Sequence, residues 1–250
     1  MNSFLRILRV EILKLRRTLA LVLAGLTPLV VVVLQCFLVL RMKEKSLAPG
    51  ANPWEAVSTA ILFWAVLMLP LFVTLVTSLL GQTEHSGDQW KSLFAQPVRR
   101  GGVYAAKILV ATGLILVAHL VLACGIILAG AAFHLAFPRT AAGPILWGPV
   151  FLTAGKAFLA SWFIIAVQAF IGLRWRSFVV ASSVGIVATI SSVLILNADR
   201  WSRFFPWSLP AIASSKAAGT SPGHALVLGI AGGLLAAVLG GRLFVRRDVI

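Results

Sequence analysis

The sequence is poor in charged residues, and poorest in acidic ones. Only 12% of the 250 residues are charged, and 7 Asp and Glu stand against 22 Lys and Arg, which gives a net charge of +15. Soluble domains carry about 25% charged residues, so this chain lacks the polar surface that keeps a protein in water. Because 60% of the residues are hydrophobic, the composition indicates a membrane protein. Most Lys and Arg lie at the ends of apolar runs, which indicates contact with anionic membrane lipid and not with nucleic acid.

The chain also lacks the motifs of common catalytic, metal and nucleotide sites. Its two cysteines, Cys36 and Cys124, lie inside apolar runs and are predicted to be small buried hydrophobic residues. Gly155-Lys156 resembles the end of a phosphate-binding loop, but Ala157 replaces the Ser or Thr that such a loop requires. No His-Glu-x-x-His motif and no pair of carboxylates occurs within the apolar runs. We therefore expect no enzymatic activity, no cofactor and no metal in this chain.

Long apolar runs are what the sequence has in abundance. Each is long enough to cross a hydrocarbon core of about 30 Å. A basic amphipathic segment, residues 4–17, precedes them and is expected to lie in the membrane interface. Pro70 is expected to kink the second run. The predicted fold is a single all-α transmembrane domain, residues 1–250, with six spans at about 18–40, 56–80, 104–133, 145–173, 177–196 and 225–245.

The distribution of positive charge predicts the orientation of these spans. An even number of spans places both termini on one side of the membrane. Lys and Arg in the segments on that side outnumber those on the other side by about two to one, which predicts cytoplasmic termini. Arg41, Lys43 and Lys45 run against this bias, because they fall in the first external loop.

A short amphipathic helix is predicted between the second and third spans. Ser86 and Gln89 have the spacing of a helix-capping box, and Pro97 would end the helix. One face would be apolar and the next charged, so the helix could rest on lipid headgroups or dock a soluble partner. The residues assigned to the docking surface are Glu84, Gly87, Asp88, Trp90, Lys91, Leu93 and Phe94.

This segment carries a family resemblance. Glu84, Trp90-Lys91, Leu93, Pro97, Arg99 and Lys107 resemble the signature of the first cytoplasmic loop in type-two ABC exporter permeases, in the branch of lantibiotic-immunity and bacitracin-resistance permeases. The Glu-x-x-Lys-Leu-Arg-Arg of residues 11–17 and the Arg-Arg-Asp of residues 246–248 are similar to the same family.

The resemblance implies a partner and a cargo. The helix between spans two and three would be the coupling helix, and residues 4–17 the elbow helix. Two permease subunits, the same or related, would assemble with two ATPase subunits that hold ATP and Mg²⁺, in a bacterial cell (inner) membrane. The exported cargo would be amphipathic or hydrophobic: a peptide antibiotic, a lantibiotic-like peptide, a drug or a lipid.

Two other functions stay open on the residues alone. One is a membrane scaffold or assembly subunit whose cytoplasmic loop binds a partner other than an ATPase. The other is an ion-coupled carrier in which Lys156 and His119 titrate during transport. A carrier predicts an internal repeat between the halves of the chain, and none is visible.

Polar and small residues inside the spans are the remaining candidates. Lys156, His119 and Gln168 could line a translocation pathway. Alternatively, Lys156 extends to the interface, and the other two form interhelical hydrogen bonds. A stripe of small residues in the last span either packs within the subunit or forms the seam between two permeases, and the aromatic segment 197–224 forms either an interfacial loop or short re-entrant helices. The stripe comprises Gly229, Gly233, Ala237 and Gly241.

Overall fold

The computed structural model describes residues 3–16, 18–42, 50–85, 100–138, 143–196, 199–215 and 221–246. Within these ranges the chain folds into helices and contains no β-strand, which confirms the predicted all-α class. In the described part of the chain, five helices are long and apolar enough to cross a membrane, and a bent pair of helices counts as a sixth span. The protein is therefore a multi-pass membrane bundle.

The first two spans follow a short N-terminal helix, α1, Ser3–Leu15. The first span is α2, Ala20–Arg41. The second begins earlier than its apolar run because Asn52 caps it: the Asn52 side chain accepts a hydrogen bond from the Trp54 N–H at 2.9 Å, and Pro53 occupies the first turn. This span comprises α4, Pro53–Ser58; α5, Ala60–Phe63; the π-helix η1, Trp64–Met68; and α6, Leu69–His85.

A π-helix stands immediately before the proline of the second span. Pro70 cannot donate a backbone hydrogen bond, and its ring would clash with the carbonyl four residues earlier in a regular α-helix. In the wider turn of η1, the Leu69 N–H bonds instead to the Trp64 carbonyl, five residues back. The expected irregularity at Pro70 thus takes the form of a π-helical segment on its N-terminal side, a feature frequent at functional sites.

The third and fourth spans differ in regularity. The third, α8, Arg100–Ala136, is an uninterrupted helix of 37 residues. At 1.5 Å per residue it is roughly 55 Å long, well beyond the thickness of a hydrocarbon core. The fourth span is broken into α9, Trp147–Ala160, and α10, Trp162–Arg174, with a bend of 42°. Ser161 at the break donates its hydroxyl to the Phe158 carbonyl at 2.6 Å, a local bond that commonly bends helices.

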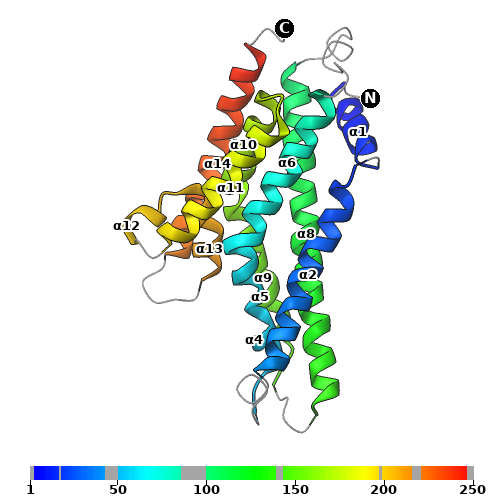
Figure 1. Cartoon of the computed structure of the whole chain (residues 1–250), viewed down its shortest axis with the longest axis vertical. Coiled ribbons are helices and arrows are strands. Elements are labelled where there is room, and N and C mark those ends of the chain that lie inside the picture. The colour runs from blue at the N-terminus through cyan, green and yellow to red at the C-terminus, as the bar shows by residue number, and fades with distance from the viewer. Residues whose placement is uncertain are drawn as a thin grey trace.

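The chain ends in a fifth span, a compact connection and a sixth span. The fifth span is α11, Phe178–Ile195, and the sixth is α14, Pro222–Val245. Between them lie α12, Asp199–Ser202; η3, Pro206–Ser208; and α13, Leu209–Ser214. All six residues of α13 are buried, and α13 packs against α9 and α14. Figure 1 shows α12 and α13 beside the bundle, partway along the long helices. The described part of this segment thus forms short helices and not the interfacial loop that was the other prediction.

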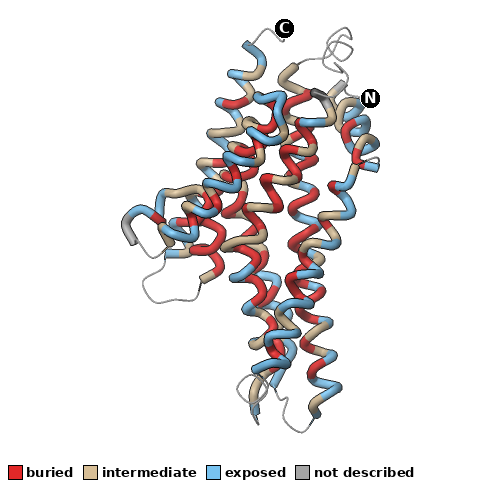
Figure 2. The backbone as a smooth tube through the Cα atoms, viewed as in Figure 1, coloured by how far each residue is buried: buried red, intermediate tan, exposed pale blue. Residues whose placement is uncertain are grey.

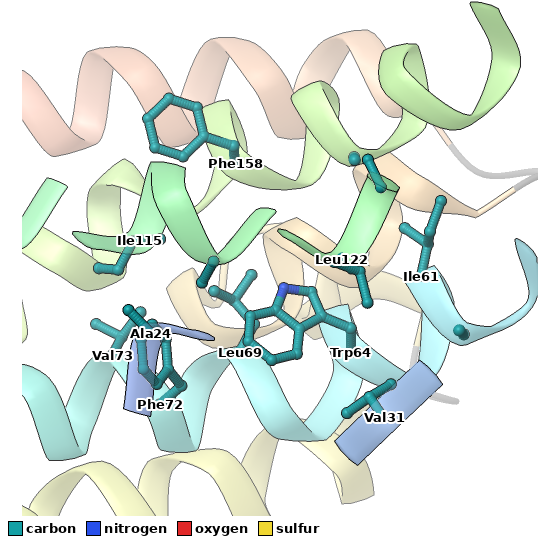
Figure 3. Close-up of a cluster of buried hydrophobic side chains, with 14 of the residues drawn as sticks. Ala24, Val31, Ile61, Trp64, Leu69, Phe72, Val73, Ile115, Leu122 and Phe158 are labelled. Carbon is teal, nitrogen blue, oxygen red and sulfur yellow. The ribbon is translucent and has the colours of Figure 1, made fainter. Parts of the chain in front are cut away.

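The hydrophobic core lies along the central helices α6, α8 and α10. Trp64 is fully buried and lies at the centre of the cluster in Figure 3, with Leu69, Leu122 and Val31 around it. In Figure 2 buried positions concentrate on α6, α8 and α10, whereas α2, α11 and α14 are largely exposed. Because the exposed side chains on these outer helices are large and apolar, these faces are suited to lipid.

Candidate functional site

The predicted docking segment joins the ends of α6 and α8. Gly87, Asp88, Trp90, Lys91, Leu93 and Phe94 lie outside the described residues, and for Glu84 only the backbone at the end of α6 is described. α6 ends at His85 and α8 begins at Arg100, so the structure places the two residues between which the segment lies. Figure 1 shows α1, the start of α8 and the end of α14 at this same end of the bundle.

A buried ion pair holds α1 against α8 next to this segment. The Lys107 ammonium lies 2.7 Å from one carboxylate oxygen of Glu11, and Lys14 lies 2.9 Å from the other. The side chains of Lys107 and Glu11 are only 2% and 4% exposed. A buried pair compensates two costly desolvations, so removing one partner leaves an uncompensated charge. The pair thus fixes the N-terminal helix on the helix that follows the docking segment.

A cluster of apolar side chains lies about one helical turn before this ion pair on α1 and α8. Val103 and Tyr104 of α8 form a buried cluster with Leu173 of α10, and Ile7 of α1 and Phe244 of α14 pack against it. Gly102 leaves room for α1, because a Cβ there would lie 3.3 Å from the Ile7 side chain. Four helices are thereby joined at the end that carries the docking segment. Sequence reasoning included Glu11 and Lys107 in the family resemblance but did not pair them.

His119 sits inside the bundle with both ring nitrogens occupied. Its Nδ1 lies 2.8 Å from the Ile115 carbonyl, and the Trp64 indole N–H faces its Nε2 at 3.4 Å. Because the indole can only donate, Nε2 accepts and Nδ1 carries the proton that the carbonyl receives. The rings of Trp64 and Phe158 also pack edge-on against the imidazole. His119 therefore links α8 to the π-helix of the second span.

The glutamines inside the spans also bridge helices. Gln168 is fully buried and donates to the Ala181 carbonyl at 2.7 Å, which connects α10 to α11. Gln35 of α2 donates to the Ala56 carbonyl at 3.0 Å and to the Thr59 hydroxyl at 2.6 Å. The sequence left two roles open for Gln168, an interhelical hydrogen bond or a place in a translocation pathway. The structure shows the interhelical hydrogen bond.

The small-residue stripe of α14 faces its own subunit at all three of its glycines. A Cβ on Gly229 would lie 2.5 Å from the Ala160 Cα, and one on Gly233 would lie 2.7 Å from the backbone of Trp162. The close approach of α14 to the break between α9 and α10 requires glycine here. A Cβ on Gly241 would lie 3.2 Å from the Tyr104 ring of α8, and Ala237 and Gly241 also line an apolar cavity of about 690 Å³ between α14 and α8.

Lys156 lines a cavity beside α13. The side chain is half-buried on α9, and the cavity of about 440 Å³ is also bounded by Leu152, Thr153 and Ser214. Among the described residues, no carboxylate lies within ion-pair distance of Lys156. The structure thus brings Lys156 to a largely apolar recess, while His119 and Gln168 are held inside the bundle and do not line this recess.

The comparisons with known proteins agree with this architecture. Residues 7–192, from α1 through most of α11, match the sequence model of a family described as ABC-2 family transporter protein. A comparison with proteins of curated function gives no match. The matched range covers well over half of the 250 residues and includes both segments joined by the Glu11–Lys107 pair. The chain therefore belongs to the ABC-2 transporter family, as a membrane-spanning permease subunit of an ABC transporter.

Proposed function

We propose that this permease works as an exporter of amphipathic or hydrophobic cargo, powered by ATP that a separate ATPase subunit hydrolyses. The working complex would contain two permease subunits, the same or related, and two ATPase subunits, in a bacterial cell membrane. Both termini and segment 86–99 would face the cytoplasm, where the ATPase binds. Peptide antibiotics, lantibiotic-like peptides, drugs and lipids are the cargo classes that we expect.

The observation that carries this proposal is the Glu11–Lys107 pair. An ATPase that moves segment 86–99 must pass force to helices that do not yield at the point of contact. α8 begins directly after that segment and is continuous over 37 residues, and α1 is tied to it by a buried pair at 2.7 Å. Helices linked in this way move as one body, so a stroke at the docking segment reaches the far end of α8.

The second span offers a place for the motion to change direction. The π-helix η1 interrupts the span between α5 and α6, and it contacts α2, α11 and α13. A movement of α6 would be taken up at this irregular turn and would shift α13 against α9. That shift would open or close the recess that contains Lys156. The permease would in this way link a cytoplasmic stroke to a site on the other side.

The alternatives fit these contacts less well. An ion-coupled carrier that uses His119 needs a ring nitrogen open to solvent or to a second titrating group, and both nitrogens are engaged inside the bundle. A scaffold subunit has no need for a long rigid helix linked to its docking segment. The exporter uses both features.

Reconstitution tests the proposal. The chain and its cognate ATPase would be placed in inside-out vesicles, and uptake of a fluorescent aminophospholipid and of a fluorescent lanthionine peptide would be followed. We expect uptake of at least one probe that requires ATP and stops with an ATPase variant unable to bind nucleotide. ATP turnover by the isolated chain, or uptake of neither probe above the ATP-free level, would contradict the proposal.

A further inference from the structure

The recess at Lys156 is one lobe of a longer groove. A neighbouring cavity of about 340 Å³ is lined by Glu55, Ser58 and Leu62 of the second span and by residues of α9 and α13. Four residues line both cavities, so the two cavities adjoin. The shared residues are Pro149, Thr153, Ser214 and Ser215.

The two lobes carry opposite charges that are not paired with each other. Glu55 lies in the first turn of α4 and lines the lobe at that end, while Lys156 lines the other. Within the described part of the chain, neither side chain forms an ion pair or a hydrogen bond. An unpaired ammonium within a membrane span is costly, and such residues are usually functional. The groove therefore presents one carboxylate and one ammonium to a bound ligand.

The hydroxyls of the groove define which partner fits the Glu55 lobe. Ser58, Thr153 and Ser214 each donate to a backbone carbonyl of their own helix, at 2.8, 2.7 and 2.7 Å. A hydroxyl that already donates retains only its lone pairs, so it acts toward a ligand as an acceptor. This lobe thus combines a carboxylate with several acceptors, which suits a group rich in N–H donors such as a primary ammonium.

The remaining walls are apolar. Ile61 and Leu62 of α5, Leu146 before α9 and Leu152 on α9 line one lobe or the other. The lobe at Lys156 offers the ammonium as a donor to a phosphate or carboxylate oxygen. A ligand that satisfies all of these surfaces has an apolar body and a head with both charges.

We infer that this groove binds the zwitterionic head of an amphipath, with a primary ammonium at Glu55 and a phosphate or carboxylate at Lys156. An aminophospholipid and a short lipopeptide with free amino and carboxyl groups both supply this chemistry. The inference names a cargo class for the exporter proposed above and rests on that function only for the transport step. Binding itself requires neither ATP nor the ATPase.

Binding to the purified full chain in detergent tests the inference. The probes are short-chain phosphatidylethanolamine, its N-acetylated form, phosphatidylglycerol with the same acyl chains, and an acylated dipeptide amphipath with free amino and carboxyl groups. The wild-type chain is expected to prefer phosphatidylethanolamine to its N-acetylated form by about tenfold, since a charge-assisted hydrogen bond is lost. Phosphatidylglycerol should bind as weakly as the acetylated lipid. Comparing the dipeptide amphipath with phosphatidylethanolamine distinguishes a lipopeptide from an aminophospholipid. The probe that binds more tightly identifies the natural ligand class.

Three variants locate the effect. Glu55→Gln should remove the preference for the free amine, and Lys156→Met should weaken binding of all four probes, each of which carries a phosphate or a carboxylate, by about tenfold. Arg203→Met, an exposed charge on the connection before η3, is the matched control and should bind as the wild type does. Equal affinities across the probes, or wild-type discrimination in both Glu55→Gln and Lys156→Met, would overturn the inference. Discrimination without ATP-driven uptake would instead contradict the exporter and leave the groove assignment standing.

Discussion

The Glu11–Lys107 pair gives the sharpest quantitative prediction. Glu11→Leu removes the carboxylate that lies 2.7 Å from the Lys107 ammonium, which is 2% exposed, and Lys107→Met removes that ammonium from the Glu11 carboxylate, which is 4% exposed. Removing one member of a buried ion pair typically costs about 3–5 kcal/mol. Each single variant should therefore lose about that much of its free energy of unfolding. Replacing both charges by apolar residues of similar size is often neutral. The double variant Glu11→Leu with Lys107→Met should therefore be more stable than either single variant.

The assay is the unfolding of the purified chain in detergent, measured for the four members of the double-mutant cycle. Arg9→Gln, an exposed position on the same helix α1, is the control for loss of one charge and should change the unfolding free energy by less than about 0.5 kcal/mol. Protease cleavage between α1 and α2 should rise in the single variants, because α1 separates from α8. Simple additivity of the two single losses would refute the idea that the charges act as a pair.

In a chain freed of Cys36 and Cys124, a cysteine at position 201 should react with an impermeant maleimide from outside, and one at position 91 only after permeabilisation; labelling of 91 from outside would reverse the topology. Gly233→Leu should lower the unfolding free energy by about 1–3 kcal/mol or more, because its side chain would overlap the backbone of Trp162. Gly113→Leu, where nothing lies within 4 Å of an added Cβ, is its control, and equal losses in the two variants would contradict the α14–α10 contact. Lys156→Met should change transport while ATP turnover of the assembled complex continues; unchanged transport would assign Lys156 a structural role.

The spans and the fold class could be predicted from the sequence because apolar runs of sufficient length carry their own signal. The irregularities inside the spans could not be placed as well. Pro70 predicted an irregularity in the second span, but a proline alone does not determine whether the helix kinks or widens into a π-helix such as Trp64–Met68. The bend at Ser161 has no strong sequence signal, since a lone serine in an apolar run is common in membrane helices.

The parts of the site that depend on distant contacts were beyond sequence reasoning. Glu11 and Lys107 are separated by 96 positions, and only the docking of α1 on α8 brings them together. The sequence did contain a signal for this ion pair. Glu11 is the one acidic residue in the basic segment 4–17, and Lys107 is a charged residue near the start of the third apolar run. The groove at Lys156 depends in the same way on α13, which carries Ser214 back to Thr153 of α9. The predicted docking residues stay a prediction, since only the backbone of Glu84 is described and the other six lie outside the described residues.

The affinity of the cognate ATPase for the permease tests the central claim most directly. It would be measured with the permease in nanodiscs, for the wild type and for Trp90→Ala. Truncating a buried aromatic anchor at an interface costs about 2 kcal/mol or more, so Trp90→Ala should weaken ATPase binding roughly thirtyfold. If segment 86–99 only rests on lipid headgroups, the variant will bind the ATPase as tightly as the wild type, and the proposal that ATP drives this permease through that segment will be wrong.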